Sequence, residues 1–236
     1  MLDSRNRKNR YMHEVSMLSP YVTMTREGHL SQVYHIFTYL KINHNARIIM
    51  DPSFPHINEV DFEHSDWSSY YGTEKEAIQR NTPEQKGKEF IIRAFIDASF
   101  GGYKLTRRSW TGLIVFIKSA PIFWFSKKQG SCEIGTSGSK FVAIRQCCEY
   151  VRGLRYKLKK IGILVNNPAL IYGDNQNVLW NTKVPDSTLK KKSSVVAYHF
   201  CREDVTRNEW VTNYVRTKDN YSDIKTKCVT NLVDRK

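Results

Sequence analysis

Three acidic residues occupy positions where carboxylates carry out chemistry in α/β proteins. Asp97 ends a nearly continuous apolar run that begins at residue 90, and Asp174 ends a shorter apolar run at residues 169–174. Runs of this kind are typical of strands buried on both faces. Because sites in open α/β sheets form at the carboxyl ends of strands, we expect the two carboxylates to share one crevice if these strands are parallel neighbours. Asp223, in a short helix predicted at about 219–227, is a candidate third member.

The chemistry that such a cluster supports is metal-assisted hydrolysis. A carboxylate at the end of a buried strand is costly unless a cation balances it. Mg²⁺ is the natural candidate, because it prefers hard oxygen ligands and keeps several waters. In basic surroundings, a carboxylate-bound metal is the arrangement needed to hydrolyse a phosphodiester. The alternative is that each acid is a turn residue or a helix N-cap, as single acids at strand ends often are.

The elements that must position these acids follow from apolar periodicity and turn residues. Strands are predicted at 90–97, 111–118, 121–126, 169–174 and 209–217. Helices are predicted at 28–42, 137–162, 194–207 and 219–227, with Gly153 as a possible break in the second. This order indicates an α/β fold with a mixed sheet and flanking helices. The apolar stripe of 28–42 favours a helix packed on a core.

Charge divides the chain of 236 residues into two parts. The formal net charge is +14; residues 1–87 hold 10 basic and 11 acidic residues, whereas residues 88–236 hold 27 and 12. This asymmetry suggests two units, the second of which faces a polyanion such as nucleic acid. The candidate nucleic-acid contacts are Arg107, Arg108, Lys127, Lys128, Lys190, Lys191 and Lys192.

Composition argues against several other classes of protein. Hydrophobic residues make up 40% of the chain, enough to build a core, so disorder is not favoured. The strongest apolar stretch, 113–117, is far shorter than the roughly 20 residues of a spanning helix, and no secretory signal is recognisable. The five cysteines form no C-x-x-C pair, which favours free thiols in a reducing, intracellular compartment, cytoplasmic or nuclear.

Five motifs resemble the C-terminal part of copia-type LTR retrotransposon Pol polyproteins, and they occur in the family's order. Residues 95–102 (FIDASFGG) resemble the family's YVDADxAG, residues 106–112 (TRRSWTG) its RRSxTG, and residues 121–129 (PIFWFSKKQ) its PIxWxSKKQ. Residues 172–176 (YGDNQ) resemble its CDNQ, and residues 222–227 (SDIKTK) its ADxxTK. Together these motifs span about 140 residues, which makes the match specific.

The resemblance implies a division of the chain. Residues 1–50 resemble the thumb-like end of a reverse transcriptase, residues 51–87 are expected to be a linker, residues 88–230 an RNase H-like domain with a five-stranded mixed sheet, and residues 231–236 a tail. The Y-x-D-D metal-binding motif of the polymerase is absent from this sequence, so no polymerase activity is expected. The implied partners are an RNA–DNA hybrid or other nucleic acid and the rest of a Pol polyprotein; no membrane is implied.

The resemblance also implies a nuclease that uses four carboxylates and two Mg²⁺ ions to cut the RNA strand of an RNA–DNA hybrid. Asp97, Asp174 and Asp223 match three of the four positions. The fourth should be a Glu on the helix predicted at 137–162, where the family has S-x-x-x-G-S-E-F-V-A, but this sequence has Lys140. An ammonium there would repel Mg²⁺ and could pair with Asp97 or Asp174 instead. Glu133 is a candidate substitute, although it lies about two helical turns, roughly 10 Å, away.

These residues leave three hypotheses open. The first is an RNase H-type nuclease domain impaired by Lys140, the second a catalytically inactive module that binds nucleic acid, and the third a decayed retroelement fragment. The alternative for Lys140 is a surface lysine, with its stem packed along the helix, in a decayed copy of the element. His199, in a segment that resembles the family's Y-H-x-x-R-E, is a weaker candidate for the site and is as easily an ordinary helix histidine.

Overall fold

A five-stranded mixed sheet forms the centre of the computed structural model, which describes residues 11–63, 65–73, 75–77, 80–103, 105–189 and 192–227. The strands are β1 (Ile92–Ser99), β2 (Trp110–Ile117), β3 (Ala120–Lys128), β4 (Ala169–Gly173) and β5 (Trp210–Tyr214). Their spatial order is β3-β2-β1-β4-β5. The pairs β1–β2 and β2–β3 are antiparallel, whereas β1–β4 and β4–β5 are parallel. The predicted mixed sheet is therefore confirmed.

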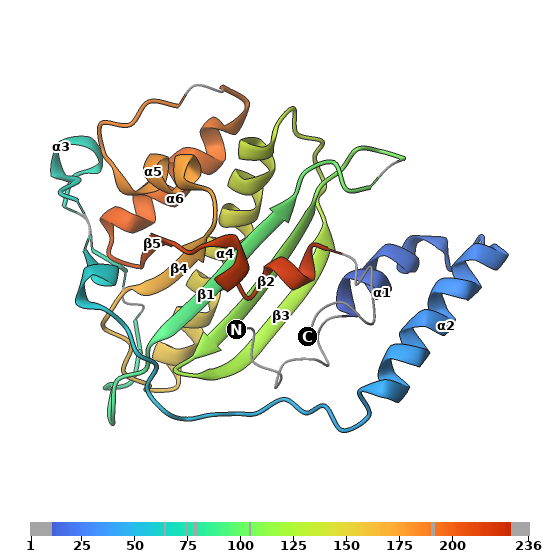
Figure 1. The fold of residues 1–236 in the computed structure, drawn as a ribbon. Coiled ribbons are helices and arrows are strands. Elements are labelled where there is room, and N and C mark those ends of the chain that lie inside the picture. The colour runs from blue at the N-terminus through green and yellow to red at the C-terminus, as the bar shows by residue number, and fades with distance from the viewer. Residues whose placement is uncertain are drawn as a thin grey trace.

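Three helices cover one face of this sheet (Figure 1). They are α4 (Thr136–Lys160), α5 (Gln176–Lys183) and α6 (Val195–Thr206). The main hydrophobic core lies between them and the sheet, where alternate residues of β1 (Ala94, Ile96 and Ala98) meet the buried stripe of α4. α4 runs unbroken through Gly153. Sequence periodicity did not predict α5, because this helix has only eight residues and Trp180 and Asn181 interrupt its apolar pattern.

The C-terminal segment departs from the prediction. In place of a helix over 219–227, the chain forms two short 3₁₀ turns at Thr217–Asp219 and Asp223–Lys225. This segment packs on the face of β2 at Gly112, which has no side chain to oppose it. A Cβ on Gly112 would lie 2.6 Å from the Cβ of Lys225 and 2.9 Å from the carbonyl oxygen of Ser222. The backbone of β2 and this segment therefore approach each other as closely as a glycine permits.

The N-terminal part forms α1 (Met12–Leu18), a 3₁₀ turn (Ser19–Tyr21) and α2 (Glu27–Ile42). α1 docks on the edge strand β3, where Ser16 Oγ donates a hydrogen bond of 2.7 Å to the carbonyl oxygen of Ser126. α2 extends beyond β3 on the outside of the fold (Figure 1). The expectation that its apolar stripe packs on a core is wrong, because the side chains of Leu30, Tyr34 and Phe37 are exposed.

Residues 51–87 run from α2, which lies beyond β3, to the other edge of the sheet at β5 (Figure 1). They contain a 3₁₀ turn (Glu59–Phe62) and the short helix α3 (Ser68–Tyr71). Elsewhere in the chain, another 3₁₀ turn precedes α6 at Lys192–Ser194. Trp67 is buried in the main core, and Glu76 forms an ion pair of 2.7 Å with the buried Arg155 of α4. This segment is thus held against the domain at defined points, while the domain boundaries stay a prediction.

Two further expectations meet the structure here. Cys147, Cys148 and Cys201 are free thiols in the core and Cys132 is an exposed free thiol, while Cys228 lies outside the described residues. Within the described ranges, no helix combines the length and the apolar character needed to cross a membrane. The tail predicted at 231–236 also lies outside the described residues.

Candidate active site

Asp97 and Asp174 meet at the ends of the two central strands. β1 and β4 are parallel neighbours, and Phe95 of β1 pairs with Tyr172 of β4. Asp97 and Asp174 each lie two residues further along, so the register places both carboxylates at the same end of the sheet. Asp97 is buried and Asp174 half-buried. The structure thus brings the two acids to one end of the sheet, as the two apolar runs predict.

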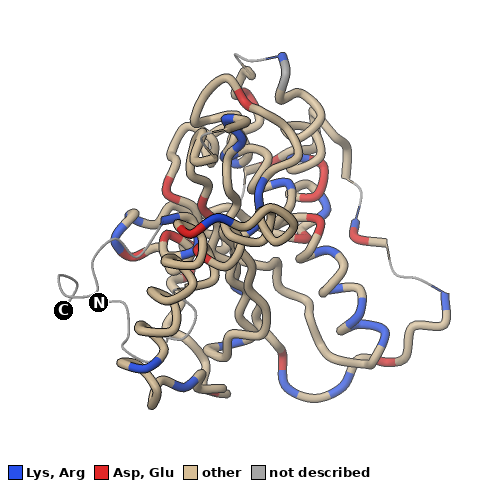
Figure 2. The backbone as a smooth tube through the Cα atoms, turned by 90° about the vertical axis from the view of Figure 1, so that its right-hand side faces the viewer, with Lys and Arg blue, Asp and Glu red and all other residues tan. Residues whose placement is uncertain are grey.

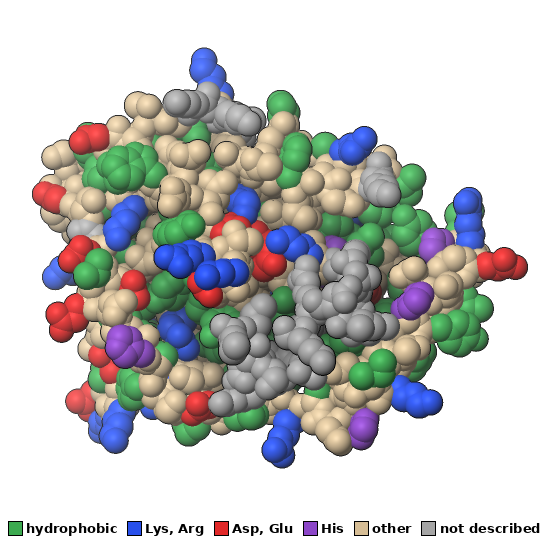
Figure 3. Space-filling model, viewed as in Figure 1, with side chains coloured by type: hydrophobic (Ala, Val, Ile, Leu, Met, Phe, Trp, Pro, Cys, Tyr) green, Lys and Arg blue, Asp and Glu red, His purple; other side chains and the backbone are tan. Residues whose placement is uncertain are grey.

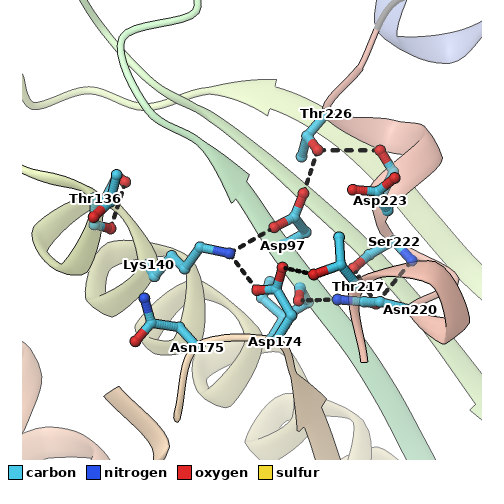
Figure 4. Close-up of polar contacts among 12 residues, drawn as sticks. Asp97, Thr136, Lys140, Asp174, Asn175, Thr217, Asn220, Ser222, Asp223 and Thr226 are labelled. Carbon is cyan, nitrogen blue, oxygen red and sulfur yellow. Dashed lines mark hydrogen bonds and ion pairs between the residues drawn. The ribbon is translucent and has the colours of Figure 1, made fainter. Parts of the chain in front are cut away.

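Lys140 occupies the space between these carboxylates. It lies in the second turn of α4, and Phe141, Ala143 and Ile144 beside it pack against the sheet. Figure 4 shows its ammonium directed at both acids. Lys140 Nζ lies 3.0 Å from Asp97 Oδ1 and also donates to Asp174 Oδ1. Its side chain is 17% exposed, so these two ion pairs are largely shielded from water.

Electrostatics favour the charged form of Lys140. Burial acts to lower the pKa of this ammonium, but the charge of Asp97 and the hydrogen bonds to Asp174 and Asp97 outweigh burial and raise its pKa above the ordinary value. For Asp223, the electrostatics favour the neutral form instead. Burial raises the pKa of its carboxyl above the usual value, Lys227 opposes that shift, and the charges of Asp97 and Asp174 add to it.

Two threonines bind the remaining oxygens of the central carboxylates. Thr226 donates from Oγ1 to Asp97 Oδ2, and Thr217 Oγ1 donates to Asp174 Oδ2 at 3.1 Å. Asn220, between them in the chain, anchors this segment to the sheet through a hydrogen bond of 2.9 Å from its Nδ2 to the carbonyl oxygen of Ile96. All four oxygens of the two carboxylates thus already accept a hydrogen bond from protein.

Asp223 lies beside this centre without joining it. Figure 4 places it on the far side of Thr226 from Lys140. Its carboxylate pairs with Lys227 at the end of the described chain. Thr226 Oγ1, which binds the carboxylate of Asp97, also contacts the backbone carbonyl of Asp223 at 3.1 Å. Thr226 thus links the carboxylate of Asp97 to the backbone of Asp223.

The residues present do not fit the Mg²⁺ ions that the resemblance implies. The position between Asp97 and Asp174 is filled by a cation of the protein itself, and each of the four carboxylate oxygens accepts a hydrogen bond. Over the described ranges, no three side chains of His, Cys, Asp and Glu come together as a metal-binding group. Glu133, the candidate substitute, accepts a hydrogen bond of 2.8 Å from Ser131 at its Oε1, and its role as a ligand stays a prediction.

The other candidate residues fall in two places. His199 is exposed on α6, where its Nδ1 lies 2.6 Å from the hydroxyl of Tyr71, and no contact joins it to the carboxylates. Arg107, Arg108, Lys127 and Lys128 flank the carboxylate end of the sheet, since β2 and β3 pair there as Trp110 with Lys128 and Thr111 with Lys127. Lys192 is exposed, while Lys190 and Lys191 lie outside the described residues.

The surface around the site is mixed in charge. Figure 2 shows Lys and Arg spread over many parts of the backbone, with Asp and Glu interspersed. In the space-filling view, acidic side chains near the middle of the face are flanked by Lys or Arg (Figure 3). The positive net charge of the chain is therefore not confined to the surroundings of the carboxylates.

Sequence reasoning missed the residues that lock the site. Thr217 ends a segment predicted to be a strand, and Asn220 and Thr226 lie in a segment predicted to be helical; nothing in their spacing distinguishes these three from exposed polar residues. Asn175 was also missed. Its side chain caps α5 by accepting a hydrogen bond of 3.1 Å from the backbone N–H of Val178. An Asn directly after a strand and before a helix is a usable N-cap signal.

The class of fold follows from the sheet. Three antiparallel strands followed by two parallel ones, in the order β3-β2-β1-β4-β5 and with acids at the ends of β1 and β4, define an RNase H-like fold. This outcome confirms the predicted fold class.

Comparison with known proteins confirms the resemblance to Pol polyproteins. Over 143 residues, 61% of its length, the chain is 27% identical to the retrovirus-related Pol polyproteins from transposons RE1 and RE2 of Arabidopsis thaliana. It is 26% identical over the same share to that from transposon TNT 1-94 of Nicotiana tabacum. The chain matches only about a tenth of the length of these relatives. No family model matches it.

Solved structures similar to the chain include RNase H domains. The N-terminal RNase H domain of a Mycobacterium tuberculosis protein has a TM-score of 0.43 and 11% identity, covering 57% of this chain and 89% of that chain. RNase H1 from Halobacterium salinarum has a TM-score of 0.42 and 12% identity, covering 57% of this chain and 91% of that one. LC11-RNase H1 in complex with an RNA/DNA hybrid gives the same scores and coverage.

Proposed function

We propose that this chain contains an RNase H-type domain of a copia-like retrotransposon polyprotein that binds RNA–DNA hybrids but cuts them poorly or not at all. The observation that carries the proposal is the position of Lys140 between Asp97 and Asp174. An ammonium there supplies the positive charge that would otherwise come from metal ions, but it provides no activated water.

The basic residues around the site support binding. Arg107, Arg108, Lys127 and Lys128 stand at the end of the sheet that carries Asp97. Contacts between such side chains and phosphates supply much of the affinity of nucleic-acid-binding proteins, independent of sequence. The domain can therefore lose cleavage and keep binding, because cleavage would depend on the carboxylates and binding on the basic side chains.

Replacing Lys140 by the acid that the resemblance implies tests this proposal. Wild type, Lys140→Glu and the matched control Lys157→Glu, which makes the same charge change at an exposed position of α4, are each incubated with a labelled RNA–DNA hybrid and Mg²⁺. We expect Lys140→Glu to cut the hybrid faster than wild type by about tenfold or more, by analogy with the loss on removing a partner from a metal site. Lys157→Glu should behave as wild type.

Two further measurements separate the alternatives. Adding Asp174→Asn to Lys140→Glu should abolish the gained activity, because one carboxylate is lost again. Hybrid binding by wild type, measured without Mg²⁺, should be retained. Robust cutting by wild type would contradict the claim that Lys140 impairs the site, and an absence of both binding and cutting would favour a decayed fragment.

A further inference from the structure

A cavity lies next to the carboxylate site, between α4, α5 and the loop 185–189. Its volume is about 490 Å³. Ser137, Gly138 and Phe141 of α4 line one side, and Asn177, Trp180 and Asn181 of α5 line another. This volume falls in the range of sites that hold a small molecule or a single nucleotide.

Trp180 is the unusual member of this lining. Its neighbours Val178 and Leu179 point into the core, whereas Trp180 is 63% exposed. An indole left in solvent forgoes the stabilisation that burying so large a ring would give. The amide side chains of Asn177 and Asn181 lie beside it in the same lining. An exposed aromatic ring next to amides is the composition of sites that stack a nucleobase and bind its edge.

The loop that lines the cavity is fixed in place. The hydroxyl of Tyr198 donates a hydrogen bond of 2.5 Å to the carbonyl oxygen of Ser187. Arg202 donates to the same carbonyl oxygen and to Ser187 Oγ, each at 3.2 Å. Ser187 Oγ in turn donates to the carbonyl oxygen of Asn181 at 3.3 Å. Loop and helix are thus tied together, so a ligand would find the cavity already formed and would pay little to order it.

The cavity and the candidate active site are built on the same two elements, α4 and the segment from Asp174 into α5. Asn177 follows Asp174 by three residues, and Gly138 precedes Lys140 by two on α4. A nucleic-acid strand lying over Asp97 and Asp174 would therefore bring a neighbouring nucleotide to the cavity mouth.

We propose that this cavity accepts an unpaired nucleobase of the bound nucleic acid, stacked on Trp180, with Asn177 and Asn181 facing its edge. The inference rests on the proposed function and deepens it. A base inside a duplex is stacked on both faces and paired along its edge, so it cannot enter a cavity without leaving the helix. The domain should therefore prefer hybrids that carry a single-stranded extension over fully paired ones.

Binding measurements with two forms of one hybrid test this proposal. A fluorescently labelled RNA–DNA hybrid is compared with the same hybrid carrying a short unpaired extension, of DNA in one arm and of RNA in another, by anisotropy at one salt concentration. Because a base stacked on an aromatic ring adds to the affinity for nucleic acid, we expect wild type to bind at least one extended hybrid about tenfold more tightly than the paired one. Trp180→Ala should remove that difference, and Trp180→Phe should keep most of it. Tyr34→Ala, at an exposed aromatic residue of α2 outside the cavity, should bind as wild type.

Tryptophan fluorescence gives a second readout that is independent of hybrid binding. Trp67, Trp110 and Trp210 are buried and Trp124 is half-buried on β3, whereas Trp180 is largely exposed, so Trp180 should account for most of the quenching on addition of a single-stranded oligonucleotide. Trp180→Phe should abolish that quenching. Failure to bind the paired hybrid would count against the proposed function alone. Equal preference for the extended hybrid in wild type and Trp180→Ala, or no quenching assignable to Trp180, would overturn the proposal about the cavity.

Discussion

At the scale of single residues, Lys140 takes part in stability as well as in function. Its ammonium places one positive charge between two carboxylates whose side chains are only 5% and 10% exposed. Like charges that close together cannot both remain ionised without a cation between them. Lys140 therefore reduces the repulsion between the two carboxylates, as a bound divalent cation does in other carboxylate sites. It does so without a metal ion from solution.

Removing this cation should destabilise the fold. We expect Lys140→Met to lower the free energy of unfolding by roughly 2–4 kcal/mol, because it leaves a buried charge pair without its partner. Millimolar Mg²⁺ should recover part of that loss in the variant and should change wild type little, since the position is open only in the variant. Urea denaturation with and without Mg²⁺ measures both effects. Lys157→Met, at an exposed position of the same helix, is the control. A wild type stabilised by Mg²⁺ as strongly as the variant would disprove this account of Lys140.

At the scale of elements, the sequence predicted the sheet better than the segments around it. The buried runs of β1 and β4 are continuous and end in acids, so both the strands and the meeting of Asp97 with Asp174 could be predicted. The stripe of α2 has the same periodicity as a core helix, yet it remains exposed, because periodicity identifies an apolar face without identifying what covers it.

The C-terminal segment could not be predicted for a different reason. Its conformation depends on contacts with distant residues. Thr226 and Thr217 bind acids more than 40 residues away in sequence, and Asn220 binds the backbone of β1. The close approach to Gly112 adds a steric requirement that only the folded sheet creates. Local propensity carries no information about any of these contacts.

His13 lies where α1 packs on the sheet, and it should make the free energy of unfolding depend on pH. His13 is buried between β3 and the C-terminal segment, with its Nδ1 3.1 Å from Ser126 Oγ and its ring edge against Trp110. Burial lowers the pKa of His13 to about 4, although a hydrogen bond with the backbone of Lys225 opposes that shift. Because the folded pKa lies below the ordinary value near 6.5, the unfolded chain binds more protons between about pH 4 and 6.5. The contribution of His13 is thus complete above that window and is lost as pH falls through it.

We expect this single residue to cost about 2 kcal/mol of stability between pH 7.5 and pH 5. Urea denaturation of wild type and His13→Gln at both pH values measures the cost. The variant should lose about that much less than wild type on acidification. His35→Gln, which changes an exposed histidine of α2, should follow wild type. A fall in stability that is the same in wild type and His13→Gln would show that α1 docks without this linkage.

At the scale of the whole molecule, the order of the strands places some of the basic residues behind the net charge of +14 at the same end of the sheet as the carboxylates. The register of β1, β2 and β3 brings Asp97, Gly112 and Ser126 into line. At the same end, Lys127 and Lys128 follow Ser126, and Arg107 and Arg108 directly precede β2. The side chains proposed to hold phosphates and the acids proposed to have once held metal therefore share one end of the sheet. Lysines elsewhere, such as Lys41 on α2 and Lys157 on α4, are exposed at positions remote from it in sequence.

This arrangement predicts which charges control hybrid binding. Each phosphate neutralised by a basic side chain contributes about −0.9 to the slope of log K against log salt concentration for a duplex. If Arg107 and Lys127 each contact a phosphate, Arg107→Gln combined with Lys127→Gln should make the slope less steep by about 2, whereas Lys41→Gln combined with Lys157→Gln should leave it nearly unchanged. Both pairs remove two exposed positive charges, so the comparison separates local contacts from the field of net charge. Equal changes in slope for the two pairs would mean that the hybrid responds to total charge and that the carboxylate end of the sheet is not its binding surface.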